Sequence, residues 1–156
     1  MEKSMTQRTV ITRNEDETIA LAQHVADAVV AARSDRAGLM IGLSGDLGMG
    51  KSVFARAFIR HVLGDDALNV PSPTFTLVQY YDAPFGALYH YDLYRLEDPE
   101  EVYELGWEES LTEGVSLVEW PERLMGMKPP AMVDISIAQI HNSDERIFTL
   151  TGDFSL

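Results

Sequence analysis

The stretch GDLGMGKS, residues 45–52, constrains the fold of this chain more than any other feature. Its spacing fits G-x-x-x-x-G-K-[ST], a loop whose backbone N–H groups surround the phosphates of a nucleotide. A short, mostly apolar run at residues 38–44 precedes the loop and is typical of a buried parallel strand. Residues 53–63 follow with apolar side chains at helical spacing, and Gly64 ends that pattern. This order places a phosphate at a helix N-terminus, and it favours nucleotide binding over a glycine-rich turn that binds nothing.

The loop supplies a set of candidate nucleotide ligands. Its glycines let the backbone approach a ligand closely because they carry no Cβ. Lys51, interpreted as a surface-loop lysine without core contacts, is expected to reach the β- and γ-phosphates, and the Ser52 hydroxyl is expected to ligate Mg²⁺. The predicted nucleotide-binding residues of the loop are Gly45, Asp46, Leu47, Gly48, Met49, Gly50, Lys51 and Ser52.

The length of the chain and its residue types point to one cytoplasmic domain. With 156 residues, a single domain with a hydrophobic core is expected, spanning residues 1–156 with its core at about 9–151. No apolar stretch reaches the roughly 18 residues that a membrane helix requires, and the first residues are too polar for a secretory signal. The absence of cysteine excludes disulfides and thiolate metal sites. We therefore expect a cytoplasmic protein without membrane attachment.

The charge of the chain limits its partners. Twelve Lys and Arg residues stand against twenty-five Asp and Glu residues, which gives a formal net charge of −13. Such a field repels nucleic acid over most of the surface. We therefore expect no direct, tight binding of tRNA or DNA by this chain alone, apart from what a small local basic patch allows.

Helix and strand signals alternate along the rest of the chain and predict an α/β fold. Asn14 stands three residues before Glu17, a capping-box-like start for a helix whose apolar face continues to Val30. Residues 71–95 are rich in aromatic and β-branched residues and are interrupted at 82–86, so they predict a hairpin with a five-residue connection. The other expected elements are a strand at 9–12, a helix from Pro99 to about Leu105, a buried strand at 115–118, and an antiparallel pair at 132–140 and 146–151. Together they predict a mixed sheet with helices on both faces.

Two acids compete for the magnesium-side position that a phosphate loop needs at the end of a neighbouring strand. Glu119 ends an apolar run typical of a buried parallel strand, so we prefer it as the metal-side acid. Asp92 ends a run that looks more like half of a hairpin, and we expect it to position water or Mg²⁺-bound water. The alternatives are that Glu119 is an exposed acid at a strand end, and that Asp92 caps a turn or pairs with Arg95.

Three further residues near these acids allow two interpretations each. Thr74, in SPTF, either senses the γ-phosphate or its magnesium as switch loops do, or is an ordinary strand residue after a stiff proline. His90 either orients Asp92 or is a satisfied buried histidine. Trp120 is either core packing, which we favour slightly, or an aromatic at the rim of the site. The candidate catalytic residues are therefore Lys51, Thr74, Asp92 and Glu119.

Four motifs together resemble one protein family. GDLGMGKS, SPTFTLV, HYDLYRL and LVEWPER occur in the order and spacing of the TsaE family (formerly YjeE), bacterial P-loop ATPases of tRNA threonylcarbamoyladenosine synthesis. The likeness extends from about Val10 to Leu150. Many NTPases share the glycine loop, whereas the other three motifs together are highly specific. The resemblance implies a P-loop NTPase-like fold and a Mg²⁺-dependent ATPase with ATP and Mg²⁺ as its cofactors.

The resemblance also implies partners and a role. It implies action with TsaB and TsaD, the pair that transfers the threonylcarbamoyl group to adenosine 37 of tRNAs reading ANN codons, so that tRNA is contacted only indirectly. ATP hydrolysis is expected to be slow in the isolated chain, to be stimulated by the partners, and to reset the complex between turnovers.

The resemblance also implies which residues form the site, and at some of these positions the sequence departs from the family pattern. Ser52 and Glu119 match the magnesium ligands, although many members carry threonine where Ser52 stands. The phosphate-holding segment matches Gly48 to Lys51, with Met49 in place of a common alanine. Base contacts are implied near Asn14 to Glu17, where we select Asp16. Arg146 is the candidate for an arginine that some relatives carry in the last hairpin.

Three rival functions remain beside the resemblance. A small-molecule kinase uses the same loop but needs a lid with several arginines, and the chain offers chiefly Arg95 and Arg123 there. A GTPase would need an Asn-Lys-x-Asp stretch, which the sequence lacks. A nucleotide-gated binding module, in which hydrolysis only resets a complex, comes close to what the family implies.

Overall fold

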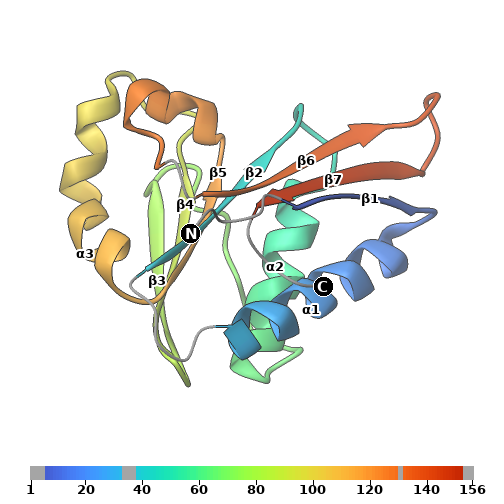
Figure 1. Cartoon of the computed structure of the whole chain (residues 1–156), viewed down its shortest axis with the longest axis horizontal. Helices are drawn as coiled ribbons and strands as arrows, with labels where there is room; N and C mark the ends of the chain where they lie inside the picture. The colour runs from blue at the N-terminus through green and yellow to red at the C-terminus, as the bar shows by residue number, and fades with distance from the viewer. Residues whose placement is uncertain (1–5, 33–37, 130–131, 153–156) are drawn as a thin grey trace.

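Seven strands form one mixed sheet in the computed structural model, which describes residues 6–32, 38–129 and 132–152 (Figure 1). The strands lie side by side in the order β1-β7-β6-β2-β5-β4-β3. Their bounds are β1 Thr6–Thr12, β2 Leu39–Ser44, β3 Val78–Ala83, β4 Gly86–Asp92, β5 Val115–Glu119, β6 Val133–Gln139 and β7 Arg146–Gly152. This arrangement confirms the predicted single-domain α/β fold with a mixed sheet. That the domain spans all of residues 1–156 stays a prediction, because both ends lie outside the described residues.

The centre of the sheet is parallel and its two edges are antiparallel. β2 pairs in parallel with β5 and β6, and β5 pairs in parallel with β4. β1 and β7 close one edge, and β3 closes the other edge against β4. Since parallel strands end at the same edge, the loop after β2 meets the last residues of β4 and β5 there. Glu119 pairs in register with Leu43 on one side and with Asp92 on the other.

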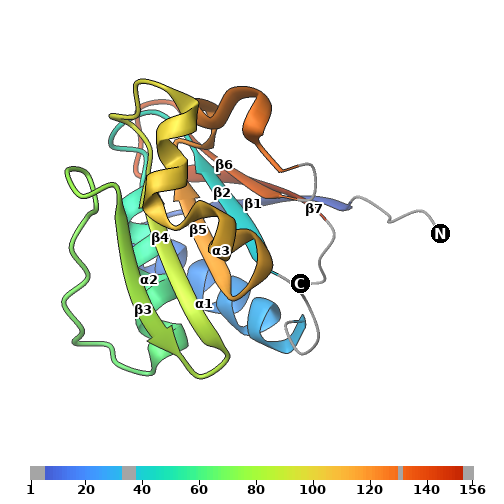
Figure 2. The same ribbon diagram turned by 90° about the vertical axis from the view of Figure 1, so that its left-hand side faces the viewer.

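Helical segments cover both faces of the sheet, as predicted. α1 (Glu15–Ala32) and α2 (Lys51–Leu63) pack against each other on one face. On the other face lie the 3₁₀ segments η1 (Pro99–Leu105) and η2 (Pro121–Met127) and the short helix α3 (Trp107–Thr112). Figure 1 shows α1 and α2 on one side of the strands and α3 on the other, and Figure 2 places α3 in front of the sheet. None of the helices in the described residues is long and apolar enough to cross a membrane.

The strands divide their side chains between two hydrophobic cores because successive residues point to opposite faces. Leu88 and Leu117 pack with the residues of α1 and α2, whereas Tyr89, Tyr91 and Val118 pack on the opposite face. The Tyr91 ring packs edge-on against the indole of Trp107 in α3, with ring centroids 5.4 Å apart. The Tyr91 hydroxyl donates a hydrogen bond to the Leu105 carbonyl of η1 at 3.0 Å. The short helical segments are therefore anchored by large aromatic side chains of β4.

The region from 71 to 112 differs from its prediction in four ways. Residues 71–77 form an extended and turn-containing loop before β3, and the hairpin connection is Pro84–Phe85 alone, because the pairing continues to Ala83 opposite Gly86. Asp98 caps the next segment as expected, with its side chain accepting from the backbone of Glu100 at 3.0 Å, but that segment is a 3₁₀ helix. Helix α3 was not predicted, since six residues are too few to show helical periodicity.

Candidate functional site

The glycine loop joins β2 to the N-terminus of α2. Gly50 is the N-cap of α2 with φ 115°, and no side chain caps the first turn, so the backbone N–H groups there are open to an anion. Gly45 has φ 146°, and a Cβ added to it would lie 2.6 Å from the carbonyl oxygen of Ile137. Both glycines are therefore required by the backbone path of the loop.

Lys51 is buried rather than a surface-loop side chain, which corrects the sequence interpretation. It is 5% exposed, and its ammonium donates to the carbonyls of Gly45 and Asp46. The same ammonium lies 4.1 Å from the centroid of the Trp120 ring. Burial lowers the pKa of Lys51, against the opposing effect of nearby acids of which Glu119 is the strongest. A phosphate at this position would replace carbonyl acceptors with anionic ones, which make stronger hydrogen bonds to an ammonium.

A cavity of about 260 Å³ lies on the side of the loop that faces β4 and β5. We call it the acid-side cavity. It brings together all four residues that the sequence selected for chemistry. Trp120 also lines it, and the same side chain packs, partly buried, against the hydrophobic core on that face of the sheet. Its lining residues are Leu47, Gly48, Gly50, Lys51, Ser52, Val53, Ser72, Thr74, Asp92, Glu119 and Trp120.

The two acids of this cavity are both buried at strand ends. Asp92 accepts a hydrogen bond from the Tyr94 backbone N–H at 3.0 Å, and burial raises the pKa of its carboxyl. Glu119 Oε2 lies 2.7 Å from His90 Nε2. The exposed-acid interpretation of Glu119 is therefore wrong. His90 is buried, as one interpretation held, but it contacts Glu119 rather than Asp92, and its Nδ1 has no partner among the described residues.

Thr74 lies in the loop before β3 and not in a strand. Its hydroxyl contacts Asp92 Oδ2 at 3.4 Å and the Ser72 hydroxyl at 2.7 Å. The loop is fixed further at Leu77, whose carbonyl accepts from the Asp92 backbone N–H at 3.0 Å. A hydroxyl on a connecting loop is thus held against one of the two acids.

The acid-side cavity has the donors that Mg²⁺ prefers, namely a hydroxyl and carboxylates. Ser52, Asp92 and Glu119 all line it. No cluster of three or more His, Cys, Asp or Glu ligands occurs in the described part of the chain. A Mg²⁺ ion is usually bound by one or two carboxylates together with substrate phosphates and waters.

A second cavity of about 310 Å³, which we call the hairpin-side cavity, lies on the other flank of the loop. Arg146 contributes to it from the start of β7. Arg146 Nε donates to the carbonyl of Met49 at 3.0 Å, and its Nη1 donates to the carbonyls of Ser143 and Glu145. The guanidinium therefore ties the phosphate loop to the last hairpin. The lining residues are Asn14, Glu15, Thr18, Gly48, Met49, Gly50, Val53, Asp144 and Arg146.

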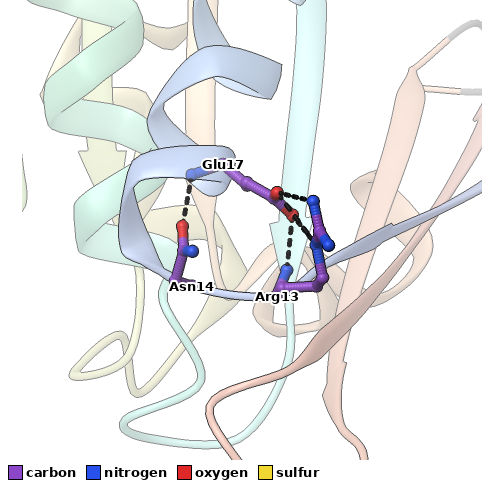
Figure 3. A network of polar contacts seen from close by, with 3 residues as sticks. All are labelled: Arg13, Asn14 and Glu17. Atoms are coloured by element: carbon purple, nitrogen blue, oxygen red, sulfur yellow. Dashed lines mark hydrogen bonds and ion pairs between the residues drawn. The ribbon is translucent and has the colours of Figure 1, made fainter.

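The start of α1 forms the far wall of the hairpin-side cavity. Asn14 Oδ1 accepts from the Glu17 backbone N–H at 2.9 Å, while Glu17 Oε1 accepts from the Arg13 N–H at 2.8 Å, one residue earlier than in a capping box (Figure 3). Arg13 and Glu17 also form an ion pair at 2.9 Å. Asp16 is exposed in the first turn and does not belong to the lining, whereas Glu15 does.

Sequence reasoning did not foresee two residues of the hairpin-side cavity, Thr18 and Asp144, or the contacts that Trp120 and His90 make. Trp120 contacts Lys51 because its backbone turns through φ 60° after β5, which no pattern in the sequence signals. Thr18 and Asp144 line the hairpin-side cavity, and His90 contacts Glu119. The capping signal at Asn14 could have indicated Thr18, which lies one helical turn further along the same helix.

A comparison with protein-family models matches residues 12–148 to the family described as "Threonylcarbamoyl adenosine biosynthesis protein TsaE". The matched range contains the phosphate loop, both acids and Arg146. The match therefore covers both cavities and the strands from β2 to β6.

Curated proteins and a solved structure agree with this match. The chain is similar to the tRNA threonylcarbamoyladenosine biosynthesis protein TsaE of Rickettsia felis, with 38% identity over 146 residues, 94% of this chain and 81% of the relative. The protein of the same name from Bacillus subtilis is 37% identical over 151 residues, 96% of this chain and 87% of the relative. The crystal structure of Bacillus subtilis YdiB superimposes with a TM-score of 0.72 at 29% identity, covering 97% of this chain and 89% of that one.

Proposed function

The chain belongs to the TsaE family, and on that premise we propose that it is a Mg²⁺-dependent ATPase that assists threonylcarbamoylation of adenosine 37 in tRNAs reading ANN codons. One observation carries the proposal. The phosphate loop lies between a cavity with buried acids and a second cavity beside α1, so a nucleotide can extend across the loop from one to the other.

In this proposal the acid-side cavity holds the reacting phosphates. Lys51 binds the β- and γ-phosphates, and Ser52 and Glu119 hold Mg²⁺, which neutralises charge developing on the γ-phosphate. Asp92 orients the attacking water, and the Thr74 hydroxyl that it holds reports whether a γ-phosphate is present. The hairpin-side cavity takes the base and ribose. Arg146 fixes the phosphate loop, and the segment around Asp16 lies at the edge of this cavity.

Hydrolysis by the isolated chain is expected to be slow. The described residues that line the acid-side cavity include no arginine. Arg95 lies over the ring of Phe75 at 4.5 Å, and Arg123 lies 5.6 Å from the ring of Tyr94. An arginine supplied by a partner commonly stabilises the transition state of phosphoryl transfer. We therefore propose that TsaB and TsaD raise the turnover or are reset by it.

The charge of the chain supports an indirect role toward tRNA. A net charge of −13 opposes binding to the phosphate backbone, so we propose that the TsaB–TsaD complex carries the tRNA and that this chain acts on the complex. A cytoplasmic location is part of the same proposal, since that is where such a complex would meet tRNA.

The test counts modified tRNA per TsaB–TsaD complex with tRNA in excess. Several rounds of tRNA modification per complex should require this chain with an intact Lys51. The Lys51→Ala variant should stop the reaction after about one round, because it no longer holds ATP. Lys128→Ala is the matched control, since Lys128 pairs with Asp134 at 2.8 Å and lines neither cavity. Calorimetry should show lost ATP affinity for Lys51→Ala alone. If the TsaB–TsaD complex completes as many rounds of modification without this chain, or with its Lys51→Ala variant, the proposed role is wrong.

A further inference from the structure

His90 is a buried polar side chain that the proposed chemistry leaves without a role. It lies on β4, which pairs directly with β5, the strand that ends in Glu119. In that pairing His90 stands opposite Leu117. The side chains of His90 and Glu119 are each 3% exposed, and the two meet at 2.7 Å. Since a carboxylate only accepts hydrogen bonds, the imidazole Nε2–H is the donor.

The imidazole is poorly explained by stability alone. Its Nδ1 is buried and has no partner among the described residues. A buried polar atom without a hydrogen bond costs folding free energy, so an apolar ring would suit a purely structural position better. The bond from Nε2 to Glu119 is the interaction that justifies a histidine at this position.

Glu119 depends on this bond for its orientation. His90 is the one hydrogen-bond partner of the Glu119 side chain within the described residues. A carboxylate at the end of a strand can rotate about its side-chain torsions, and a single fixed hydrogen bond removes much of that freedom. Because His90 occupies Oε2, the other oxygen of the same carboxylate stays available in the cavity that Ser52 and Asp92 also line.

A small cavity that His90 also lines places it near two loops of the site. It measures about 20 Å³ and is lined by His90, Ser52 and Ser72, together with Arg56, Val70 and Pro71. That volume is close to what one water molecule needs, and two hydroxyl-bearing residues border it. His90 therefore contacts Glu119 and lies close to both the serine of the phosphate loop and the loop that carries Thr74.

We propose that His90 is a positioning residue that holds the Glu119 carboxylate in the orientation that binds Mg²⁺. The inference rests on the proposed metal role of Glu119 and adds to it the group on which that role depends. Partners of this kind, which hydrogen-bond to a metal-binding group without touching the metal, typically change metal affinity by about 10- to 100-fold when they are removed.

The experiment measures Mn²⁺ affinity by electron paramagnetic resonance in the full chain saturated with a non-hydrolysable ATP analogue. His90→Gln keeps an N–H at the distance of Nε2, whereas His90→Asn is polar but too short to reach Glu119. We expect His90→Asn to weaken Mn²⁺ binding about tenfold and His90→Gln to stay within about threefold of the parent chain. Nucleotide affinity without metal should be the same in both variants, and thermal melting identifies any loss of folding.

Two reference variants separate the possible failures. Glu119→Gln should weaken Mn²⁺ binding, and adding His90→Asn to it should cause no further loss, because both changes remove the same interaction. If Glu119→Gln leaves Mn²⁺ affinity unchanged, the proposed metal role is wrong. If Glu119→Gln weakens binding while His90→Asn does not, or if Gln and Asn at position 90 weaken it equally, the positioning role alone is overturned. Should His90→Asn fail to fold, His90→Phe compared with His90→Gln makes the same test.

Discussion

The two cavities beside the phosphate loop are built from different kinds of contact. On the acid side Lys51, Asp92 and Glu119 are all buried. The two acids stand at the ends of the parallel strands β4 and β5, and Glu119 is hydrogen-bonded there by His90. Lys51 opens α2 and lies against the Trp120 ring. On the hairpin side Asn14 and Asp144 are exposed. There Arg146 contacts backbone carbonyls.

In the proposed function, this difference separates the residues that carry out the reaction from those that bind the nucleotide. Groups that stabilise developing charge act most strongly when they are fixed and removed from water, because little reorganisation is then needed during the reaction. Groups that only hold a base and ribose can remain partly solvated, since their contribution is the same before and during the reaction. Changes on the acid side should therefore affect the rate of hydrolysis, and changes on the hairpin side should affect nucleotide affinity.

The largest expected effect comes from Glu119. We expect Glu119→Gln to reduce Mg²⁺-dependent ATP hydrolysis about 100-fold or more, because it removes a charge-assisted metal contact at a buried position without changing side-chain volume. Asp92→Asn should cost less, about tenfold, since Asp92 is expected to orient water. Steady-state phosphate release at saturating ATP measures both effects.

An exposed acid on η2 provides the control for charge alone. Glu122→Gln removes the same charge close to the site, and it should leave the rate nearly unchanged because Glu122 lines neither cavity. If Asp92→Asn abolishes the magnesium dependence and Glu119→Gln does not, the roles of the two acids are reversed.

A smaller effect of a different kind is expected on the hairpin side. Arg146→Ala should raise KM for ATP about tenfold with little change in kcat, because the guanidinium holds Met49 of the loop and does not reach the reacting phosphates. Arg146→Lys should recover only part of the loss, since an ammonium cannot reproduce the contacts to three carbonyls. Arg8→Ala, on exposed β1, is the control. A fall in kcat with unchanged KM would remove the distinction between the two cavities.

The acid side was largely predictable because its signals are local. The phosphate loop, the strand before it and the helix after it lie next to one another in sequence, and the burial of β5 follows from a short, mostly apolar run. Parallel strands that end at one edge then bring Asp92 and Glu119 together. The bond between His90 and Glu119 was missed because it depends on the register of two strands 29 residues apart.

The hairpin side depends on contacts over longer separations, so its details were harder to predict. Arg146 and Met49 are 97 residues apart, and their hydrogen bond requires β7 and the loop to meet through the packing of the whole sheet. The capping signal located the start of α1 correctly, but it could not tell which side chains of the first turn face the cavity. Glu15 does so and Asp16 does not, because neighbouring residues of a helix point in different directions.

Thr74 gives the smallest expected effect, and it tests where the acid side ends. Its hydroxyl lies among the catalytic candidates, but Thr74 is only half-buried, on a mostly exposed loop. Its contact with Asp92 is also long, at 3.4 Å. A hydrogen bond of ordinary net strength contributes about 1 kcal/mol, or about fivefold in an equilibrium. We therefore expect Thr74→Val to reduce the ratio of ATP-dependent to ADP-dependent affinity for TsaB–TsaD by about fivefold or less.

The same variant should change ATP affinity less than Lys51→Ala does, because Thr74 senses the γ-phosphate in this proposal whereas Lys51 holds it. Thr74→Ser keeps the hydroxyl and should preserve the ratio, which separates the hydrogen bond from the shape of the side chain. Surface plasmon resonance with immobilised TsaB–TsaD measures the affinity with each nucleotide. If the parent chain binds the complex equally with ATP and ADP, Thr74 has no signal to transmit and the loop before β3 is only a wall of the cavity. If instead Thr74→Val lowers kcat as strongly as Asp92→Asn, the hydroxyl acts with Asp92 in orienting water, and the acid side extends into the loop.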